Sequence, residues 1–296
     1  MRVPKLSRPG LLQRTVGNVV SGAMFAYGWV ALRYQHRLAP GADMNSQHPL
    51  VSVLIPTHNR ADLLIKRSLT SVLSQTYRNL EVIVCAHGCT DDTVKNVTGL
   101  NDPRVRLLVV PRDSLGYPES AENHWLVGPV RPLNAGTKAA RGQLIALLGD
   151  DDEWVPDHLE KSVAELLTSG AEWVSGWSKD IDSQGSVSTN MGSHEGIEVV
   201  GGVATWVYVA YLRFAKWNIH SWRKGWDRPN DIDLAQRFLK MGVRHSLLPR
   251  VGAIWQPRPG ETSLGVAAYI ENSVEMLQRF AVKPSELKKE KGRRGV

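Results

Sequence analysis

Short apolar runs alternate with amphipathic stretches over the first half of the chain. The runs are LVSVLI at 50–55, LEVIVC at 80–85, VRLLVV at 105–110 and QLIALL at 143–148. Continuous apolar runs of this length are typical of strands that are buried on both faces of a parallel sheet. The pattern therefore predicts four strands of a parallel sheet, of which those at 50–55 and 80–85 are buried.

Helical patterns separate these runs. After Asn59, which we expect to cap a helix, Ile65, Leu69, Val72 and Leu73 recur at the spacing of one helix face. Further helices are expected after Thr90–Asp92, around 134–141 and near Pro156. This alternation predicts an α/β fold, a doubly wound, mostly parallel sheet flanked by helices, with ligands at the carboxyl ends of the strands.

Three polar loops follow predicted strands and should open on that edge of the sheet. They are Pro56–Arg60, His87–Asp92 and Gly149–Glu153. The sequence contains no G-x-G-x-x-G and no G-x-x-x-x-G-K-[ST] motif. This disfavours a dinucleotide-dependent dehydrogenase and a P-loop enzyme.

The loop after the fourth run contains three consecutive aspartates, Asp150, Asp151 and Asp152. Their mutual repulsion costs free energy unless a positive charge lies among them. Oxygen ligands favour Mg²⁺ or Mn²⁺, which commonly bridge one or two carboxylates to substrate phosphates. The alternative is an acidic turn that caps the helix near Pro156.

Taken together, these loops carry a family resemblance. The stretches VSVLIPTHNR from Val51, LSQTYRNLEVIVCAHGCTDDT from Leu73 and NAGTKAARGQLIALLGDDDEWVPD from Asn134 resemble the nucleotide-binding half of family 2 glycosyltransferases of the GT-A fold. The resemblance is close over 50–165 and loose over 166–260. It implies an inverting transfer of a sugar from a nucleotide-diphosphate donor (UDP-, dTDP- or GDP-sugar), with Mn²⁺ or Mg²⁺ as cofactor.

The resemblance also assigns site residues. Asp151 matches the principal metal ligand, with Asp150 and Asp152 beside it. His58 is placed to stack on the base. The donor-binding residues that it implies are Pro56, Thr57, His58, Asn59, Arg60, His87, Arg131, Asn134 and Asp150. Asn59 as a helix cap alone and Arg131 as a surface charge alone remain open alternatives.

The catalytic base of an inverting transfer takes the proton of the acceptor hydroxyl. The stretch NDIDLAQRF from Asn230 resembles the family's E-D-x-x-L-x-x-R stretch, and Asp231 matches the base. Asp233 and Asp227 are rival bases, and a helix-capping role for Asp231 is the structural alternative. Asn230 replaces the usual neighbouring Glu, whose charge would have raised the pKa of the base.

Two further positions depart from the family pattern. His87 replaces an acid that reads the uracil N3 proton, although a neutral imidazole can still accept that hydrogen bond. Gly149 replaces the first acid of the usual D-x-D, so metal binding falls on the aspartates after it.

The acceptor is expected to dock near Asp231. Trp217, Trp222 and Trp226 lie just before it in the sequence, and aromatic faces suit sugar rings, although tryptophan is more often part of the core. The long excursion 111–131 is a candidate acceptor lid. Arg258 lies in a late loop that can close over the diphosphate.

The net charge of +7 is concentrated at the two ends. Residues 1–48 carry +5 and residues 283–296 carry +4, which leaves the body near −2. This argues against a nucleic-acid groove. The 18 uncharged residues from Thr15 to Leu32 lie between arginines, and we expect an interfacial or packed helix there rather than a membrane span. We expect a cytoplasmic protein, peripheral at the cytoplasmic membrane face.

Four regions are expected: a basic N-terminal segment with the membrane-associated helix (1–48), a nucleotide-sugar-binding half (49–152), an acceptor-binding half (153–260) and a C-terminal helix with a basic tail (261–296). Cys85 and Cys89 are too few for a disulfide framework or a zinc site. The leading hypothesis is an active transferase acting on a glycan, lipid-linked or protein acceptor. Its rivals are a catalytically silent relative that binds a carbohydrate or nucleotide, and a nucleotidyltransferase.

Overall fold

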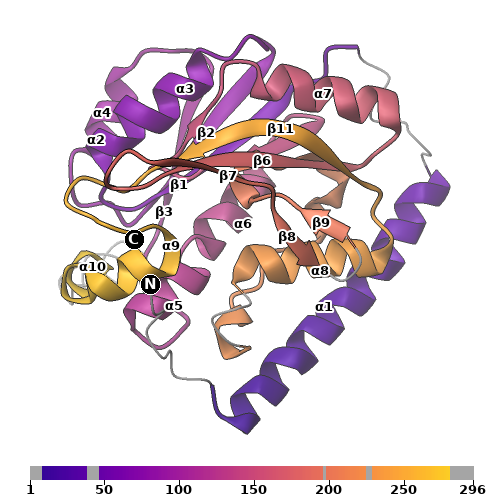
Figure 1. Cartoon of the computed structure of the whole chain (residues 1–296). Helices are drawn as coiled ribbons and strands as arrows, with labels where there is room; N and C mark the ends of the chain where they lie inside the picture. Colours follow the sequence, from indigo (N-terminus) through magenta and orange to yellow (C-terminus); the bar gives the residue numbers. More distant parts are fainter. Residues whose placement is uncertain (1–8, 39–46, 196–197, 225–228, 281–296) are drawn as a thin grey trace, which may run out of the picture.

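The computed structural model describes residues 9–38, 47–195, 198–224 and 229–280. Trp226 and Asp227, together with the C-terminal basic tail, lie outside the described residues. Helices cover both faces of one twisted sheet, and a long helix, α1 (Leu11–Leu38), runs along one side of the body (Figure 1).

The four predicted strands form the parallel half of the sheet. They are β1 (Val51–Thr57), β2 (Leu80–His87), β3 (Val105–Val110) and β4 (Leu144–Leu147). β1 pairs with β2 on one side and with β4 on the other, and β3 extends the sheet beyond β2. All residues of β2 and β4 are buried, including Glu81 of β2, whose carboxylate accepts hydrogen bonds from Ser52 and Arg106, whereas β3 at the edge of the sheet is only partly buried. The chain reverses its direction of winding between β1 and β4, and open α/β sheets bind ligands at such a point.

Helices pack on both faces of this half. The segments are α2 (Ala61–Leu63), a π-helical turn (Leu64–Leu69), α3 (Thr70–Leu73), α4 (Thr93–Gly99), α5 (Ala121–Val127) and α6 (Val130–Ala139). α3 and α4 lie on one face of the sheet and α6 on the other (Figure 1). The helix expected at 134–141 begins earlier, at Val130, because Pro132 is tolerated in a first helical turn.

The prediction that Asn59 caps the following helix is wrong. Asn59 has a left-handed φ of 53°. Its Oδ1 accepts hydrogen bonds from the backbone N–H groups of Thr90 (2.7 Å) and Asp91 (3.3 Å). The side chain therefore ties the loop after β1 to the loop after β2.

The second half continues the same sheet. Its strands are β5 (Glu153–Trp154), β6 (Trp173–Ile181), β7 (Val187–Asn190), β10 (Val207–Val209) and β11 (His245–Trp255), with a small hairpin of β8 (Ser193–Glu195) and β9 (Glu198–Val200). β10 is antiparallel to both β4 and β6 and joins the two halves. β11 runs parallel to β6. The predicted α/β fold with a mostly parallel sheet is confirmed.

The remaining helices are α7 (His158–Ser169), α8 (Asn230–Met241), α9 (Gly265–Glu271) and α10 (Ser273–Phe280), with 3₁₀ turns at Val203–Thr205, Ala210–Phe214 and Ser221–Arg223. α7 covers the same face as α3, and α8 lies below the sheet beside α1 (Figure 1). α9 and α10 pack beside α5 at the edge that holds the strand-end loops.

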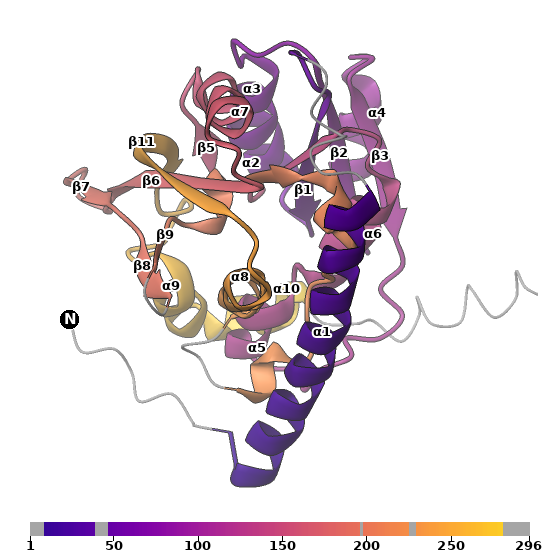
Figure 2. The same cartoon turned by 90° about the vertical axis from the view of Figure 1, so that its right-hand side faces the viewer.

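α1 packs against the body through two glycines and through Leu32, which joins the main core. Gly17 and Gly28 are buried, and a side chain at Gly28 would lie 2.4 Å from the Met241 sulfur. The same helix leaves large apolar side chains exposed, including Val19 at 66% and Val30 at 61%. Figure 2 shows α1 along the outside of the molecule, with its N-terminal end reaching beyond the body. The helix therefore has an inner face that packs closely on the body and an exposed outer face that carries apolar side chains.

A buried charge network joins α1 to α8. Asp233 is fully buried and pairs with Lys224 (2.5 Å) and Arg237 (2.8 Å). The Ser21 hydroxyl of α1 donates to Asp233 Oδ1 at 2.7 Å. Burial acts to raise the pKa of Asp233, but Arg237 and Lys224 outweigh it and lower that pKa below its ordinary value. One carboxylate thus balances two buried cations.

Replacement of Asp233 by Asn should lower the free energy of unfolding by about 3 to 5 kcal/mol, because it leaves two buried cations without a counter-ion. Urea denaturation near pH 7 measures the change. The effect should shrink as the pH falls below the ordinary carboxyl pKa, because the carboxyl of the unfolded chain is then protonated, and it should be lost once the pH falls below the lowered pKa of the folded state. Asp62→Asn, in an exposed pair with Lys66, is the control and should change the free energy by less than about 1 kcal/mol. Equal effects of the two substitutions would contradict the network.

Candidate active site

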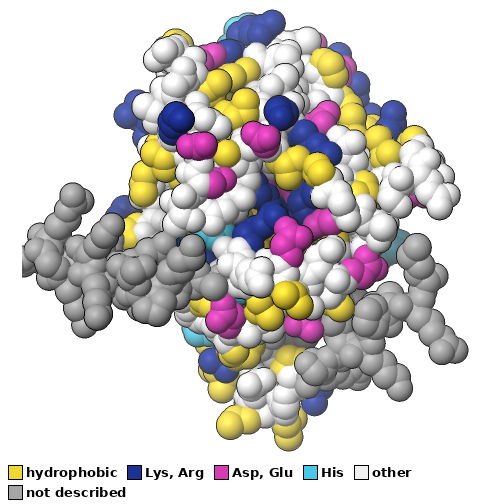
Figure 3. Space-filling model, turned by 90° about the vertical axis from the view of Figure 1, so that its left-hand side faces the viewer, with side chains coloured by type: hydrophobic (Ala, Val, Ile, Leu, Met, Phe, Trp, Pro, Cys, Tyr) yellow, Lys and Arg dark blue, Asp and Glu magenta, His cyan; other side chains and the backbone are white. Residues whose placement is uncertain are grey.

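One cavity of about 360 Å³ opens at the carboxyl ends of β1, β2 and β4. Its lining includes His58, the three aspartates of 150–152 and Asp231. Figure 3 shows a hollow in this face of the molecule with Lys or Arg side chains inside it and acidic side chains on its rim. The loops that the sequence placed at one sheet edge therefore share a cavity with the start of α8.

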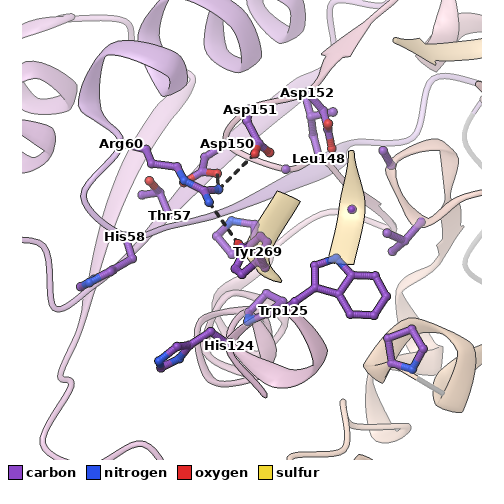
Figure 4. Close-up of a pocket in the computed structure, with 18 of the residues that line it drawn as sticks. Thr57, His58, Arg60, His124, Trp125, Leu148, Asp150, Asp151, Asp152 and Tyr269 are labelled. Carbon is purple, nitrogen blue, oxygen red and sulfur yellow. Dashed lines mark hydrogen bonds and ion pairs between the residues drawn. The ribbon is translucent and has the colours of Figure 1, made fainter. Parts of the chain in front are cut away.

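Arginines hold the acidic motif. Arg60 Nη1 lies 2.7 Å from Asp150 Oδ1 and 3.2 Å from Asp151 Oδ2. Arg258 Nη1 lies 2.9 Å from the same Asp151 oxygen. In Figure 4 the Arg60 side chain points at both carboxylates, and its second branch reaches Tyr269 of α9. Two guanidinium groups thus neutralise the carboxylates nearest the end of β4.

The three aspartates have different protonation tendencies. Burial acts to raise the pKa of Asp151, but Arg60 and Arg258 outweigh it and lower that pKa. Burial and then the charges of Asp151 and Asp150 raise the pKa of Asp152 well above its usual range. Asp152 is therefore the carboxyl of the three that most needs an additional cation.

Gly149, which replaces the family's acid, has a steric explanation. A Cβ at this position would lie 2.6 Å from Asp152 Oδ2 and 3.1 Å from Asp151 Oδ1. The glycine therefore leaves room for both carboxylates to turn into the cavity.

No ready-made metal cluster of three His, Cys, Asp or Glu residues occurs within the described residues. Mg²⁺ and Mn²⁺ often use only one or two protein carboxylates and complete their coordination with water and substrate phosphate. The residues present fit that kind of cation if Arg60 and Arg258 turn from Asp151 to the incoming phosphates. Asp151 and Asp152 are the side chains that would hold it.

Histidines line the other end of the cavity. His58 Nδ1 lies 2.6 Å from the His87 carbonyl oxygen, and Nε2 lies 2.7 Å from the Arg279 carbonyl oxygen. Burial, then Arg112, lowers the pKa of His58 to about 4 and that of His87 to about 3. Both rings are therefore neutral near pH 7. His87 Nε2 has no hydrogen-bond partner among the described residues.

Asp231 lies in the first turn of α8 and faces the cavity. Burial raises its pKa. Its neighbour Asn230 donates from Nδ2 to the Leu126 carbonyl oxygen at 2.7 Å, which fixes the start of α8 against α5. The rival Asp233 faces the opposite side of the helix, where it is bound in the network with α1.

The other predicted residues divide into two groups. Pro56, Thr57 and Trp217 line the cavity. Arg131 instead contacts Asp113 and Ser114, and Asn134 exchanges two hydrogen bonds with the Trp217 backbone. Asn59 bonds to the loop after β2, and Trp222 is buried beside Arg223. Neither of these last two lines the cavity.

Several lining residues were not predicted. Arg112, His124 and Trp125 come from the excursion 111–131, and Trp255 and Tyr269 come from β11 and α9. The excursion is longer than a usual βα connection, and this length was the signal available in the sequence. No local pattern marks Trp255 or Tyr269, which reach the cavity only through the packing of the second half.

Comparisons with known proteins agree with this architecture. Residues 52–194 match the model of the family described as "Glycosyl transferase family 2". The chain is 32% identical over 127 residues to the Escherichia coli UDP-Glc:alpha-D-GlcNAc-diphosphoundecaprenol beta-1,3-glucosyltransferase WfgD, a match that covers 43% of this chain and 45% of that protein. It is 36% identical over 121 residues to the chondroitin synthase of Pasteurella multocida, which covers 40% of this chain and 11% of the relative.

Solved structures share the fold at low sequence identity. Staphylococcus aureus TarS in complex with UDP-GlcNAc aligns with a TM-score of 0.53 and 18% identity, over 72% of this chain and 60% of that one. The mannosyltransferase PcManGT of Pyrobaculum calidifontis, in complex with GDP-Man and Mn²⁺, aligns with a TM-score of 0.50 and 20% identity, over 84% and 69%. These likenesses confirm the predicted GT-A fold.

The curated relatives are matched over less than half of their own length. The matched region nevertheless contains β1 to β4 and the complete acidic motif, in the order that the fold requires. This region, residues 52–194, is therefore similar to glycosyl transferase family 2 over just under half of the chain.

Proposed function

We propose that the protein is an inverting glycosyltransferase that moves a sugar from a nucleoside-diphosphate donor to a hydroxyl of an acceptor, with Mn²⁺ or Mg²⁺ as cofactor. The observation that carries the proposal is the single cavity that contains the arginine-bound acidic motif and, on α8, a carboxylate with a raised pKa. An inverting transfer needs these two elements: charge neutralisation for the leaving group and a base for the acceptor.

The donor lies with its base towards His58 and His87 and its diphosphate towards Arg60, Arg258 and the aspartates. The neutral, unpaired His87 Nε2 is available to bond a base edge. A bound Mn²⁺ or Mg²⁺ would neutralise charge on the departing diphosphate. The names of the relatives support this class of donor, since WfgD uses UDP-Glc and the two structural neighbours bind UDP-GlcNAc and GDP-Man.

Asp231 acts as the base. The acceptor hydroxyl oxygen bonds to the anomeric carbon as the bond from that carbon to the diphosphate oxygen breaks, and the electron pair of that bond leaves with the diphosphate. The hydroxyl proton passes to the Asp231 carboxylate. Attack from the face opposite the leaving group inverts the configuration. A raised pKa makes this carboxylate a stronger base than an exposed one.

The acceptor docks beside Asp231, where Trp217, Trp125 and Trp255 line the cavity. Aromatic faces suit the apolar faces of sugar rings. The relative WfgD acts on a sugar joined through a diphosphate to a polyprenol. A lipid-linked glycan is therefore the acceptor class that we favour.

Contact with a membrane suits such an acceptor. α1 is long and apolar enough to cross a bilayer by length and composition. However, its inner face is bonded to the body through Ser21, and His36 lies 2.5 Å from Glu172. A helix that keeps these contacts lies along the membrane surface, with its apolar outer face towards lipid and Arg33 and Arg37 near anionic headgroups. These features support our proposal that the protein works at the cytoplasmic membrane face.

The competing function is a catalytically silent carbohydrate-binding or nucleotide-binding protein. It is favoured by the replacement of three family acids by His87, Gly149 and Asn230. Turnover in the presence of a donor and Mn²⁺ separates the two functions.

Asp231→Asn should leave UDP affinity near the wild-type value and reduce transfer by about two to four orders of magnitude, because the acceptor proton loses its base. In the wild type, transfer should fall as the pH drops through the raised pKa of Asp231, and the variant should lack this fall. Release of UDP from a UDP-sugar series, with the acceptor present, measures both. Asp92→Asn, at the start of α4, is the control. Wild-type turnover in Asp231→Asn would contradict the assignment.

Asp151→Asn should remove the gain in UDP affinity that Mn²⁺ confers, a loss of at least about tenfold. Metal-free UDP binding should be unchanged or tighter, because Arg60 and Arg258 are released to the phosphates. Calorimetric titration with and without Mn²⁺ tests this. The control is Asp157→Asn, whose carboxylate pairs with Arg250 outside the cavity. A variant that keeps the full Mn²⁺ effect would refute Asp151 as a ligand.

Val19→Glu combined with Val30→Glu should shift the protein from sedimented anionic vesicles to the supernatant, because both side chains lie on the exposed face of α1. Hydrolysis of a soluble donor should be retained. Deletion of the helix is a poorer test, since it also removes Ser21 from Asp233. Val187→Glu, at an exposed position on β7, is the control for added charge. Unchanged sedimentation of the double variant would exclude this face as the contact.

A further inference from the structure

The C-terminal helix α10 enters the donor end of the cavity. Met276 and Phe280 of α10 form a small apolar cluster with Ala121 of α5 and with Tyr269 of α9. This cluster is separate from the main core. α10 is therefore held by a local patch, and its removal leaves the packing of the sheet intact.

The Phe280 ring lies against His58 and His124, at the end of the cavity that we assign to the donor's base. Its centroid is 5.2 Å from that of His58 and 4.6 Å from that of His124, with interplanar angles of 23° and 22°. The Phe280 carbonyl oxygen accepts a hydrogen bond from Arg112 Nη2 at 2.6 Å. A flat ring and a carbonyl oxygen thus occupy this end of the cavity together.

The polar groups around the Phe280 ring cannot form hydrogen bonds with it. Near it, His87 Nε2, His124 Nε2 and Arg112 Nε have no hydrogen-bond partner within the described part of the chain. Buried polar atoms are costly when they are unpaired, and a phenyl ring cannot pair them. His58 adds a second mismatch: its neutral ring carries one proton but faces two carbonyl oxygens. A ligand ring that carries polar edges would suit this environment better than Phe280 does.

We propose that Phe280 and its carbonyl group occupy the place of the donor's base, so that α10 is an internal competitor that must withdraw before the donor binds. This inference rests on the proposed function and adds His124 to the residues that contact the base. It also restricts the base to one that presents a carbonyl oxygen to Arg112, as uracil, thymine and guanine do and adenine does not.

The covalent connection permits this withdrawal. Gly260 lies in the loop between β11 and α9, and Gly265 is the first residue of α9; their φ values are 86° and 62°, with open space at both Cβ positions. The loop also carries Arg258, which binds Asp151, and Tyr269 of α9 bonds to Arg60. Withdrawal of α9 and α10 therefore vacates the end of the cavity beside His58 and His124. The same movement releases Arg60 from Tyr269 at the end that holds the aspartates.

The test measures UDP affinity by calorimetry in the presence of Mn²⁺ on the full chain. Phe280→Ala should tighten UDP binding at least about tenfold, because the competing conformation is weakened. Met276→Ala should tighten it as well. Met276 is buried in the α10 cluster and does not line the cavity, so it can act only by loosening the helix. Val274→Ala, on the exposed side of α10, is the matched control and should leave the affinity unchanged. Thermal melting confirms that each variant is folded.

Hydrogen exchange gives the second measurement. Saturating UDP should speed exchange of the α10 amides in the wild type. The proposal would be overturned if UDP instead protected these amides, since α10 would then be a closing lid. It would also be overturned if UDP affinity were unchanged or weaker in both Phe280→Ala and Met276→Ala, since α10 would then be a fixed wall of the cavity. ADP binding as tight as UDP in Phe280→Ala would also count against it.

The outcomes also separate this inference from the proposed function. If Mn²⁺-dependent UDP binding is present in the wild type and lost in Asp151→Asn, donor binding is established whatever the Phe280 variants do. If UDP binds neither the wild type nor Phe280→Ala, both proposals fail.

Discussion

The pairing of Arg60 and Arg258 with Asp150 and Asp151 is the interaction on which the site depends. Three adjacent carboxylates repel one another in a half-buried loop, and the two guanidinium groups allow that loop to exist without a bound cation. The same arginines are the natural partners of a diphosphate. Under the proposed function, binding of a metal with its diphosphate would be an exchange of partners, in which Asp151 and Asp152 would hold the metal and the two arginines would turn to the phosphates. Net charge in the cavity stays nearly balanced at each stage.

Such an exchange would explain why the described residues hold no complete metal cluster although they hold the acids for one. A preformed cluster would need all three carboxylates turned towards one point, which would increase their repulsion and break the pairing of Asp150 and Asp151 with the two arginines. Gly149 contributes by leaving space for Asp151 and Asp152 to rotate. Gly149, which stands where the family has its first acid, therefore changes how the loop packs and lets Asp151 and Asp152 face the cavity.

The parallel strands, the fold and the loops at the strand ends were predictable from the sequence, because unbroken apolar runs mark buried strands and the topology brings their carboxyl ends to one edge. Asn59 was misassigned as a helix cap because its left-handed backbone turns the side chain towards the loop after β2. Arg112, His124 and Phe280 were not predictable as one cluster. They come from segments more than 150 residues apart, and only the packing of α10 on α5 brings Phe280 to the others.

α8 connects the two surfaces that the function requires. Asp231 and Asp233 are two residues apart, which is about 200° around a helix, so one faces the cavity and the other faces α1. Asp233 is held by Ser21 of α1 and by two buried cations, and Asn230 holds the start of the helix on α5. The orientation of Asp231 is therefore set by contacts with the helix whose outer face we assign to the membrane. Under the proposed function, a lipid-linked acceptor that approaches along the membrane would meet Asp231 at a position that is fixed relative to that surface.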